Sequence, residues 1–280
     1  MRPDEYKRAS LAVWQAVAGA WDERHAYMER VARPVTDRLI ERLAPKPGDR
    51  VLELAAGTGV VGLAVAIELQ GRGKVVVSDF SEPMVDAARR HGDELGLANV
   101  EYRMLDAENL DLPDDSFEGV VCRWGYMLMP EPAKALAETR RVLSPEGRLS
   151  FAVFGQAEDN PWAAIPAGVL TGRGHMPPPE AGVPGILALG DRNRLRRMVV
   201  EAAFSDPELD EVAFAWTFAS EDDYWRYLTE VAGAISMVLG RLHEDERRDV
   251  RGEVAERIAP FGTPDGGVAL PATCLVASAA

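Results

Sequence analysis

The feature that most constrains the fold is the stretch from Val51 to Gly62, V-L-E-L-A-A-G-T-G-V-V-G. Its largely apolar start is typical of a buried parallel strand. The glycines after it can adopt positive φ, and the following run V-V-G-L-A-V-A-I-E-L contains good helix formers with an apolar face. Strand, glycine turn and helix together predict half of a nucleotide-binding βαβ unit, with a ligand at the positive end of the helix.

The glycines alone leave the ligand open. Gly57, Gly59 and Gly62 spell the dinucleotide fingerprint G-x-G-x-x-G, and Asp79 follows at about the expected distance of 20 residues. Glu53, inside the strand, favours another ligand. A carboxylate beside a pyrophosphate would suffer like-charge repulsion in a cleft of low dielectric constant, so a dinucleotide gains nothing from it.

Glu53 followed by A-A-G-T-G resembles motif I of the class I S-adenosylmethionine-dependent methyltransferases, (D/E)-x-G-x-G-x-G. Ala55 stands where that pattern has its first glycine. The resemblance implies an α/β, Rossmann-like fold with a mostly parallel seven-stranded sheet, helices on both faces, N-terminal helices and a C-terminal or lid insertion. It also implies that Glu53 holds the methionine moiety of the cofactor and that the turn lines the same pocket, through Ala55, Gly57, Thr58 and Gly59.

A second acidic residue follows the β-branched run K-V-V-V-S, which predicts a strand. A carboxylate at this strand end can accept hydrogen bonds from both ribose hydroxyls, which makes Asp79 the expected ribose ligand. The alternative is a turn or cap residue before the helix that starts near Ser81. Phe80 and Met84 come just after Asp79, and each is a candidate either for packing on the adenine or for a place in the core.

A third acidic residue, Asp106, ends the strand predicted at 100–105. The sequence here, D-A-E-N-L-D-L-P-D-D-S-F-E, resembles the D-A-x-x-L-P-F-x-D-x-S-F-D stretch of the UbiE-like methyltransferases of ubiquinone and menaquinone biosynthesis. The resemblance implies that Asp106 binds the adenine amino group, with Ala107 and Glu108 beside it.

The next predicted strand, Phe117 to Cys122, is followed by R-W-G-Y-M. Ligands of open α/β sheets lie outside the carboxyl ends of the strands where strand order reverses, so these residues are expected to face the transferable methyl group. We assign Arg123 to the cofactor, and Trp124, Tyr126 and Met127 to an aromatic wall for the acceptor. A simple loop is the alternative for any one of them.

The chain divides into four predicted parts: an N-terminal helical cap at 1–45, a cofactor-binding core at 46–154, a lid or insertion at 155–190, and a C-terminal part at 191–280 that completes the sheet. Glycine and proline crowd the third part, so no regular core element is expected there. The other predicted elements are helices at 11–19 and 22–43 with a break near Pro34, helices at 191–204, 221–242 and 244–258, and strands at 208–218 and 267–278.

Candidate acceptor and catalytic residues lie outside the core. Trp14 and Trp21 form one wall of the acceptor pocket by resemblance to the UbiE-like group, or simply pack on the core. Trp162, His175 and Met176 belong to the predicted lid. If the acceptor is a phenol, an enol or a carbon acid, a base must remove its proton, and the candidates are His25 and His175. His91 and His243 fall on predicted solvent-facing helices.

The net charge of −14 argues against nucleic acid as a partner and favours a small-molecule substrate. Cys122 and Cys274 stand alone, which predicts a reduced and cytoplasmic protein, and no residue cluster suggests a metal. No membrane insertion is expected, because no apolar run approaches the length of a span. Acidic enzymes of this size are often dimers, so a homodimer is possible.

These observations predict a methyltransferase that uses S-adenosylmethionine, with S-adenosylhomocysteine as product, to methylate oxygen or carbon of a small apolar or aromatic acceptor. One alternative is a protein of the same fold that binds the cofactor without methylating, such as a cyclase or a regulator. Another is an NAD(P)-dependent oxidoreductase, which leaves Glu53 and Asp106 without roles.

Overall fold

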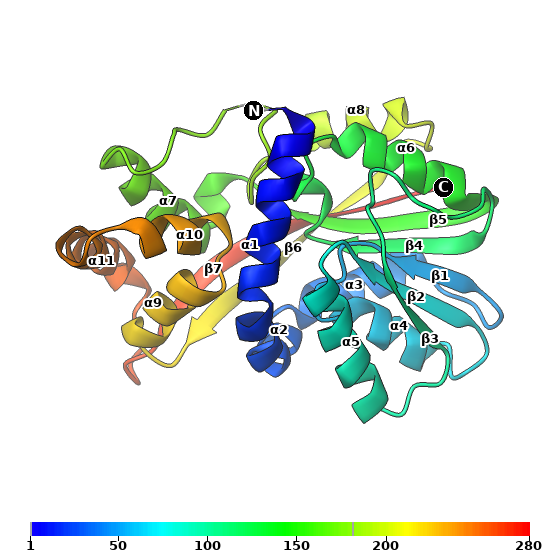
Figure 1. The fold of residues 1–280 in the computed structure, drawn as a ribbon, viewed down its shortest axis with the longest axis horizontal. Coiled ribbons are helices and arrows are strands. Elements are labelled where there is room, and N and C mark those ends of the chain that lie inside the picture. The colour runs from blue at the N-terminus through cyan, green and yellow to red at the C-terminus, as the bar shows by residue number, and fades with distance from the viewer. Residues whose placement is uncertain (1, 181) are drawn as a thin grey trace.

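The computed structural model describes residues 2–180 and 182–280, and a seven-stranded sheet runs through its centre (Figure 1). The strand order is β3-β2-β1-β4-β5-β7-β6. Strand β7 is antiparallel to both of its neighbours, and the other neighbouring strands are parallel. The predicted α/β fold with a mostly parallel sheet is therefore confirmed. The strands are β1 (Arg50–Glu53), β2 (Lys74–Asp79), β3 (Val100–Met104), β4 (Phe117–Arg123), β5 (Leu143–Phe154), β6 (Glu208–Phe218) and β7 (Val268–Ala279).

Helices cover both faces of the sheet, with α6 and α8 on one side and α3 and α4 on the other (Figure 1). Each contributes an apolar face; α3, for example, buries Val35, Leu39 and Leu43. Pro34 lies in the first turn of α3, where its missing N–H costs no hydrogen bond, so the break predicted there is confirmed. These helices are α3 (Arg33–Leu43), α4 (Val60–Glu68), α5 (Glu82–Glu94), α6 (Pro132–Val142) and α8 (Arg192–Glu201).

The N-terminal helices start earlier than the sequence pattern predicted. Helix α1 spans Pro3–Glu23 and is followed by α2 (His25–Val31). Proline at the first position and acidic side chains in the first turn, Asp4 and Glu5, satisfy the start of α1 through the helix dipole. Helix α1 packs against α5 beside the carboxyl ends of the parallel strands. It therefore stands next to the predicted cofactor site.

The sequence predicts no regular element in the glycine- and proline-rich part of the chain, and this prediction is wrong. Helix α7 (Pro161–Gly172) lies within it, and Trp162, Val169 and Leu170 are buried. Pro161 occupies the first turn, where proline is tolerated, and the apolar face of the helix packs against α11 and β7. Tertiary packing has overridden the local signals. Whether 155–190 acts as a lid stays a prediction, and residue 181 lies outside the described residues.

The C-terminal helices gather with α7 at one end of the sheet (Figure 1). The helix predicted at 221–242 is two helices, because Gly233 takes a positive φ of 52° between them. The elements are α9 (Glu221–Glu230), α10 (Ala234–Arg241) and α11 (Glu244–Ile258), and the short 3₁₀ turns of the chain are Tyr126–Leu128, Ala157–Asp159 and Ala259–Phe261. Within the described residues, no helix has both the length and the apolar character needed to cross a bilayer.

Candidate functional site

The glycine turn after β1 forms the floor of the site. Ala55, Gly57 and Gly59 all have positive φ, at 50°, 55° and 82°. A Cβ on Gly59 would also lie 2.9 Å from the Cβ of Ala88 on α5, so that position needs glycine for space as well as for conformation. Helix α4 begins directly after Gly59, and its positive end faces the turn.

Glu53 ends β1 and is buried beneath this turn, with 1% of its surface exposed. Its Oε2 atom has no hydrogen-bond partner in the described part of the chain. A Cβ on Gly62 would lie 2.3 Å from that oxygen, so the third glycine of the fingerprint makes room for the carboxylate. Burial raises the pKa of Glu53 to about 8, against the lowering effect of the nearby Arg123 cation.

Asp79 ends β2 and ties the turn to the second strand. Its two oxygens accept hydrogen bonds from the backbone N–H groups of Gly57 and Ser81, both at 2.9 Å. The side chain is 6% exposed, and burial raises its pKa to about 6 although the backbone bonds act in the opposite direction. Asp79 is thus a turn residue, the alternative role considered for it, and it still has acceptor capacity for a ligand.

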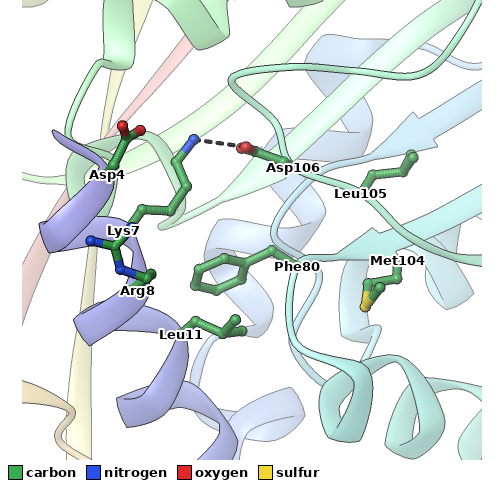
Figure 2. A pocket seen from close by; sticks show the side chains of 8 residues that line it. All are labelled: Asp4, Lys7, Arg8, Leu11, Phe80, Met104, Leu105 and Asp106. Carbon is green, nitrogen blue, oxygen red and sulfur yellow. Dashed lines mark hydrogen bonds and ion pairs between the residues drawn. The ribbon is translucent and has the colours of Figure 1, made fainter.

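A pocket of about 410 Å³ opens beside Asp79, between α1 and the ends of β2 and β3. Figure 2 shows Lys7 and Leu11 on α1 facing Asp106 and Phe80 on the sheet side. The Lys7 ammonium lies 2.7 Å from Asp106 and 2.5 Å from the buried Glu108, so α1 is bound to the sheet edge by charge. The lining residues are Asp4, Lys7, Arg8, Leu11, Phe80, Met104, Leu105 and Asp106.

Of the two predicted adenine neighbours that follow Asp79, Phe80 lines the pocket and Met84 lies elsewhere. Met84 is 1% exposed and packs in a small core with Val17, Trp14 and Trp21, so it does not line the pocket. Met84 therefore has the core role that the sequence left open, because α1 covers this turn of α5. The same contacts place Trp14 and Trp21 in packing against α5, and the Trp21 indole donates to the carbonyl of Val231.

Ala107 and Glu108 follow Asp106, as predicted, but neither of them lines the pocket. Glu108 is 1% exposed. Its Oε1 accepts a hydrogen bond of 2.6 Å from the backbone of Glu131, and its Oε2 lies beside the Lys7 ammonium. Glu108 therefore joins the sheet edge, α1 and the start of α6.

The residues predicted to form a wall after β4, Trp124, Tyr126 and Met127, are all buried. Tyr126 is fully buried and its hydroxyl bonds the Thr139 hydroxyl at 2.6 Å, so it belongs to the core. Met127 is buried too. Trp124 has a φ of 63° and stacks on Phe154 with the ring centroids 4.7 Å apart. The prediction of a wall facing a ligand is wrong for Tyr126 because this segment turns into a 3₁₀ turn that packs under α6.

Trp124 is part of a larger group of packed rings, which we call the aromatic cluster. Its members come from distant segments, and pattern analysis of the sequence missed all of them except Trp124 and Trp162. The available signal was the alternation of aromatic residues along β6 at 214, 216 and 218. The Trp216 indole N–H and the Tyr27 hydroxyl have no partner among the described residues. The cluster comprises Tyr27, Trp124, Phe154, Trp162, Phe214, Trp216, Phe218 and Tyr227.

His25, one predicted base, contacts the glycine turn. Its Nδ1 lies 2.8 Å from the Thr58 hydroxyl, and its ring stacks on His91 with a centroid distance of 3.6 Å. His91 in turn bonds Asp22 at 2.8 Å, so the prediction that His91 faces solvent is wrong. Burial, aided by repulsion from His91 and Arg123, lowers the pKa of His25 to about 4.

The other predicted catalytic and acceptor residues are separate from this group. His175 and Met176 follow α7, and both of their backbone amides donate to the carbonyl of Leu170. Met176 packs against the main core, and Trp162 is buried in the aromatic cluster. No group of three metal-ligating side chains occurs in the residues that the structure describes. Cys122 and Cys274 are both buried, and burial raises the pKa of each thiol to about 12.

Comparison with known proteins supports the geometry. The methyltransferase domain family matches residues 51–147. The chain is 30% identical over 259 residues to a malonyl-[acyl-carrier protein] O-methyltransferase of Halorhodospira halophila. The aligned region covers 90% of this chain and 80% of the relative. It is 36% identical over 162 residues to a demethylmenaquinone methyltransferase of Clavibacter sepedonicus. That aligned region covers 55% of this chain and 62% of that relative.

The chain spans less than two thirds of the demethylmenaquinone and UbiE-type methyltransferases that it matches, at 61% to 63% of their length. Among solved structures, a methyltransferase of Bacillus halodurans, described as putative, superposes with a TM-score of 0.60 and 21% identity. The match covers 87% of this chain and 97% of that one. This likeness concerns the fold.

Proposed function

Because the chain belongs to the class I S-adenosylmethionine-dependent methyltransferases and is UbiE-like, we propose that it methylates a small acceptor at oxygen or carbon. The acceptor we propose is apolar or aromatic. The wall that supports this choice is the aromatic cluster, which begins at Trp124, directly after β4. In this fold the end of that strand lies beside the point where strand order reverses.

The observation that carries the proposal is a pair of buried carboxylates at neighbouring strand ends. Burial raises the pKa of Glu53 to about 8 and that of Asp79 to about 6. A ligand with positive charge lowers both pKa values, because it favours the ionised form of both groups. A pyrophosphate would add negative charge to the same edge. The pair therefore fits S-adenosylmethionine, with its sulfonium and ammonium groups, and not a dinucleotide.

The residues present fit this cofactor along its length. Glu53, with its unpartnered oxygen, and the turn from Ala55 to Gly59 would hold the methionine part. Asp79 has spare acceptor capacity for the ribose, since each oxygen uses one backbone donor. Phe80 and Asp106 line the pocket that would take the adenine.

The bound cofactor supplies an electrophilic methyl group on sulfur. The chain itself contributes binding and orientation, which can account for about 7–11 kcal/mol of a barrier in favourable cases. His25 is a weak proton acceptor because its pKa is lowered to about 4, far from the neutral range where a general base works best. We therefore propose that His25 holds Thr58 and the turn, and does not remove a proton from the acceptor.

Calorimetric titration with S-adenosylmethionine, S-adenosylhomocysteine and NAD tests the cofactor. We expect both adenosyl ligands to bind wild type, and Glu53→Gln and Asp79→Asn to weaken them at least tenfold. Glu201→Gln, on the exposed side of α8, is the matched control and should bind as wild type does. Binding of NAD without a response to the adenosyl ligands would refute the proposal.

Transfer of a labelled methyl group tests the reaction. The names of the relatives suggest one acceptor for transfer to carbon, demethylmenaquinone, and one for transfer to oxygen, malonyl-[acyl-carrier protein]. Label recovered in either product supports methylation and identifies the acceptor atom. Tight binding of the cofactor with no transfer to either acceptor, or to a panel of phenols, would favour the non-methylating alternative.

A further inference from the structure

Arg123 has no carboxylate within ion-pair distance among the described residues. It is the last residue of β4, and its side chain is only partly exposed. Its one side-chain hydrogen bond to the described residues goes to a neutral group, the Thr36 hydroxyl, at 2.8 Å. Arg24 nearby is paired with Asp223 at 3.2 Å. Arg123 therefore keeps most of its N–H donors available.

The groups that face Arg123 do not neutralise it. The charges of Glu53 on β1, Cys274 on β7 and Glu29 on α2 raise the pKa of Arg123, but none of these groups forms an ion pair with it. Burial raises the pKa of Glu53 to about 8 and that of the Cys274 thiol to about 12, so both are largely uncharged near neutral pH. Burial lowers the pKa of Arg123 to about 10, which still leaves it charged.

The guanidinium lies between the two halves of the site. Its central carbon lies 4.8 Å from the ring centroid of Trp124, the first member of the aromatic cluster. Its charge also lowers the pKa of His25, which contacts the glycine turn. The adenine pocket does not include it. Arg123 is thus a cation at the acceptor end of the site, next to rings that suit an apolar body.

The geometry points to Arg123 as the residue that selects an acceptor carrying a negatively charged oxygen, through charge-assisted hydrogen bonds from its free N–H groups. This inference rests on the proposed function and narrows it to phenolate-type or carboxylate-bearing acceptors. It replaces the assignment of Arg123 to the cofactor. It also removes the need for a strong base, because an acceptor bound as an anion has already lost its proton.

Two features of the aromatic cluster fit such an acceptor. The Trp216 indole N–H and the Tyr27 hydroxyl are buried donors without partners in the described residues. A buried donor without a partner is costly, and a ligand oxygen can supply the missing acceptor. A flat acceptor with more than one oxygen would therefore satisfy groups that an all-hydrocarbon acceptor leaves unpaired.

The test measures binding to protein saturated with S-adenosylhomocysteine, using pairs of probes of similar shape and different charge. The phenolate pair is 4-nitrophenol, titrated at a pH where it is ionised, and 4-nitroanisole. The carboxylate pair is 2-naphthoate and 2-naphthamide. We expect wild type to bind the anion of at least one pair about 10- to 100-fold more tightly than its neutral partner, and the favoured pair identifies the kind of oxygen.

Arg123→Gln should abolish this preference and leave the affinity for S-adenosylhomocysteine unchanged, whereas Arg123→Lys should keep part of it. The matched control is Arg24→Gln, which removes another arginine that contacts the cluster, at Tyr27 and Tyr227, and should keep the full preference. A wild-type protein without anion preference, or a glutamine variant that retains it, overturns the inference. So does an equal loss of S-adenosylhomocysteine affinity, which would return Arg123 to the cofactor. Failure of wild type to bind S-adenosylhomocysteine at all would instead refute the proposed function.

Discussion

Glu53→Gln should change how the stability of the protein depends on pH. The substitution preserves the shape of the side chain, replaces one carboxyl oxygen with an amide NH2 group and removes the ability to ionise. In the folded protein burial raises the pKa of Glu53 from 4.5 to about 8. Between these values the native state holds a proton that the unfolded chain has lost, so the free energy of unfolding falls as pH rises. The whole window corresponds to about 5 kcal/mol.

The range from pH 6 to pH 8 isolates this residue. Asp79, the other buried carboxyl group, has a pKa of about 6 and titrates mostly below that range. Because Glu53 is already half ionised at pH 8, its contribution over these two pH units is about 2 kcal/mol. Urea unfolding at pH 6, 7 and 8 should therefore show wild type losing about 2 kcal/mol more than Glu53→Gln. The other ionisable groups are the same in both proteins and cancel in the difference.

The control and the cofactor make the experiment decisive. Glu201→Gln, on exposed surface, should follow wild type at every pH. Saturating S-adenosylmethionine should reduce the pH dependence of wild type, because its positive charge favours ionised Glu53, and binding at pH 7 should release protons to the buffer. A difference between wild type and Glu53→Gln that stays constant within about 0.5 kcal/mol from pH 6 to pH 8 would show that the burial argument is wrong.

Further substitutions, at the site and elsewhere in the fold, test packing and charge by urea unfolding. Gly62→Ala should destabilise the protein by about 1–3 kcal/mol, because the new Cβ would meet the Glu53 carboxyl group at 2.3 Å. In the control, Gly19→Ala in α1, the new Cβ meets nothing within 4 Å, so this variant should be more stable by about 0.5–1 kcal/mol. A Gly62→Ala variant as stable as wild type would contradict the reasoning. Lys7→Met should reduce the free energy of unfolding by about 1–3 kcal/mol, because it leaves the buried Glu108 carboxylate without its cation. Adding Glu108→Gln should recover most of this loss. If it does not, the lysine acts only through packing. Arg42→Met breaks the ion pair that joins α3 to β6 and should cost about 0.5–1 kcal/mol, an effect that must shrink in 1 M salt if it is electrostatic.

The sequence predicted the strand, turn and helix around the glycines because those signals are local. Glycines that need positive φ, an apolar strand before them and a helical pattern after them all lie within about two dozen residues of one another. Asp79 and Asp106 were found in the same way, as the acidic residues that follow two further apolar strands. The family resemblance predicted a mostly parallel seven-stranded sheet, which no local pattern specifies, and the strand order is known only from the structure.

Contacts between distant segments could not be predicted. Met84 is adjacent to the site in sequence, yet α1 folds over it and buries it with Trp14. His91 follows the buried residues Met84, Ala87 and Ala88 at helical spacing on α5, but only the approach of α2 brings His25 onto its ring. Helix α7 contains features that locally oppose a helix, including Pro166 in its interior. In each case the deciding term is tertiary packing, which overrides local propensity.

Backbone strain marks the place where the two ends of the site meet. Ala55 and Trp124 are both non-glycine residues in the left-handed region, one after β1 and the other after β4. Each such residue costs of the order of 1–3 kcal/mol and persists only where its surroundings enforce it. A Cβ on Gly125 would lie 2.6 Å from the Cβ of Ala55, so the alanine that replaces the family's first glycine is accommodated by a glycine on the neighbouring strand end. β1 and β4 are adjacent at the point where strand order reverses, and the strain there fixes the turn beneath the cofactor and the ring of Trp124 beside Arg123 in one rigid arrangement.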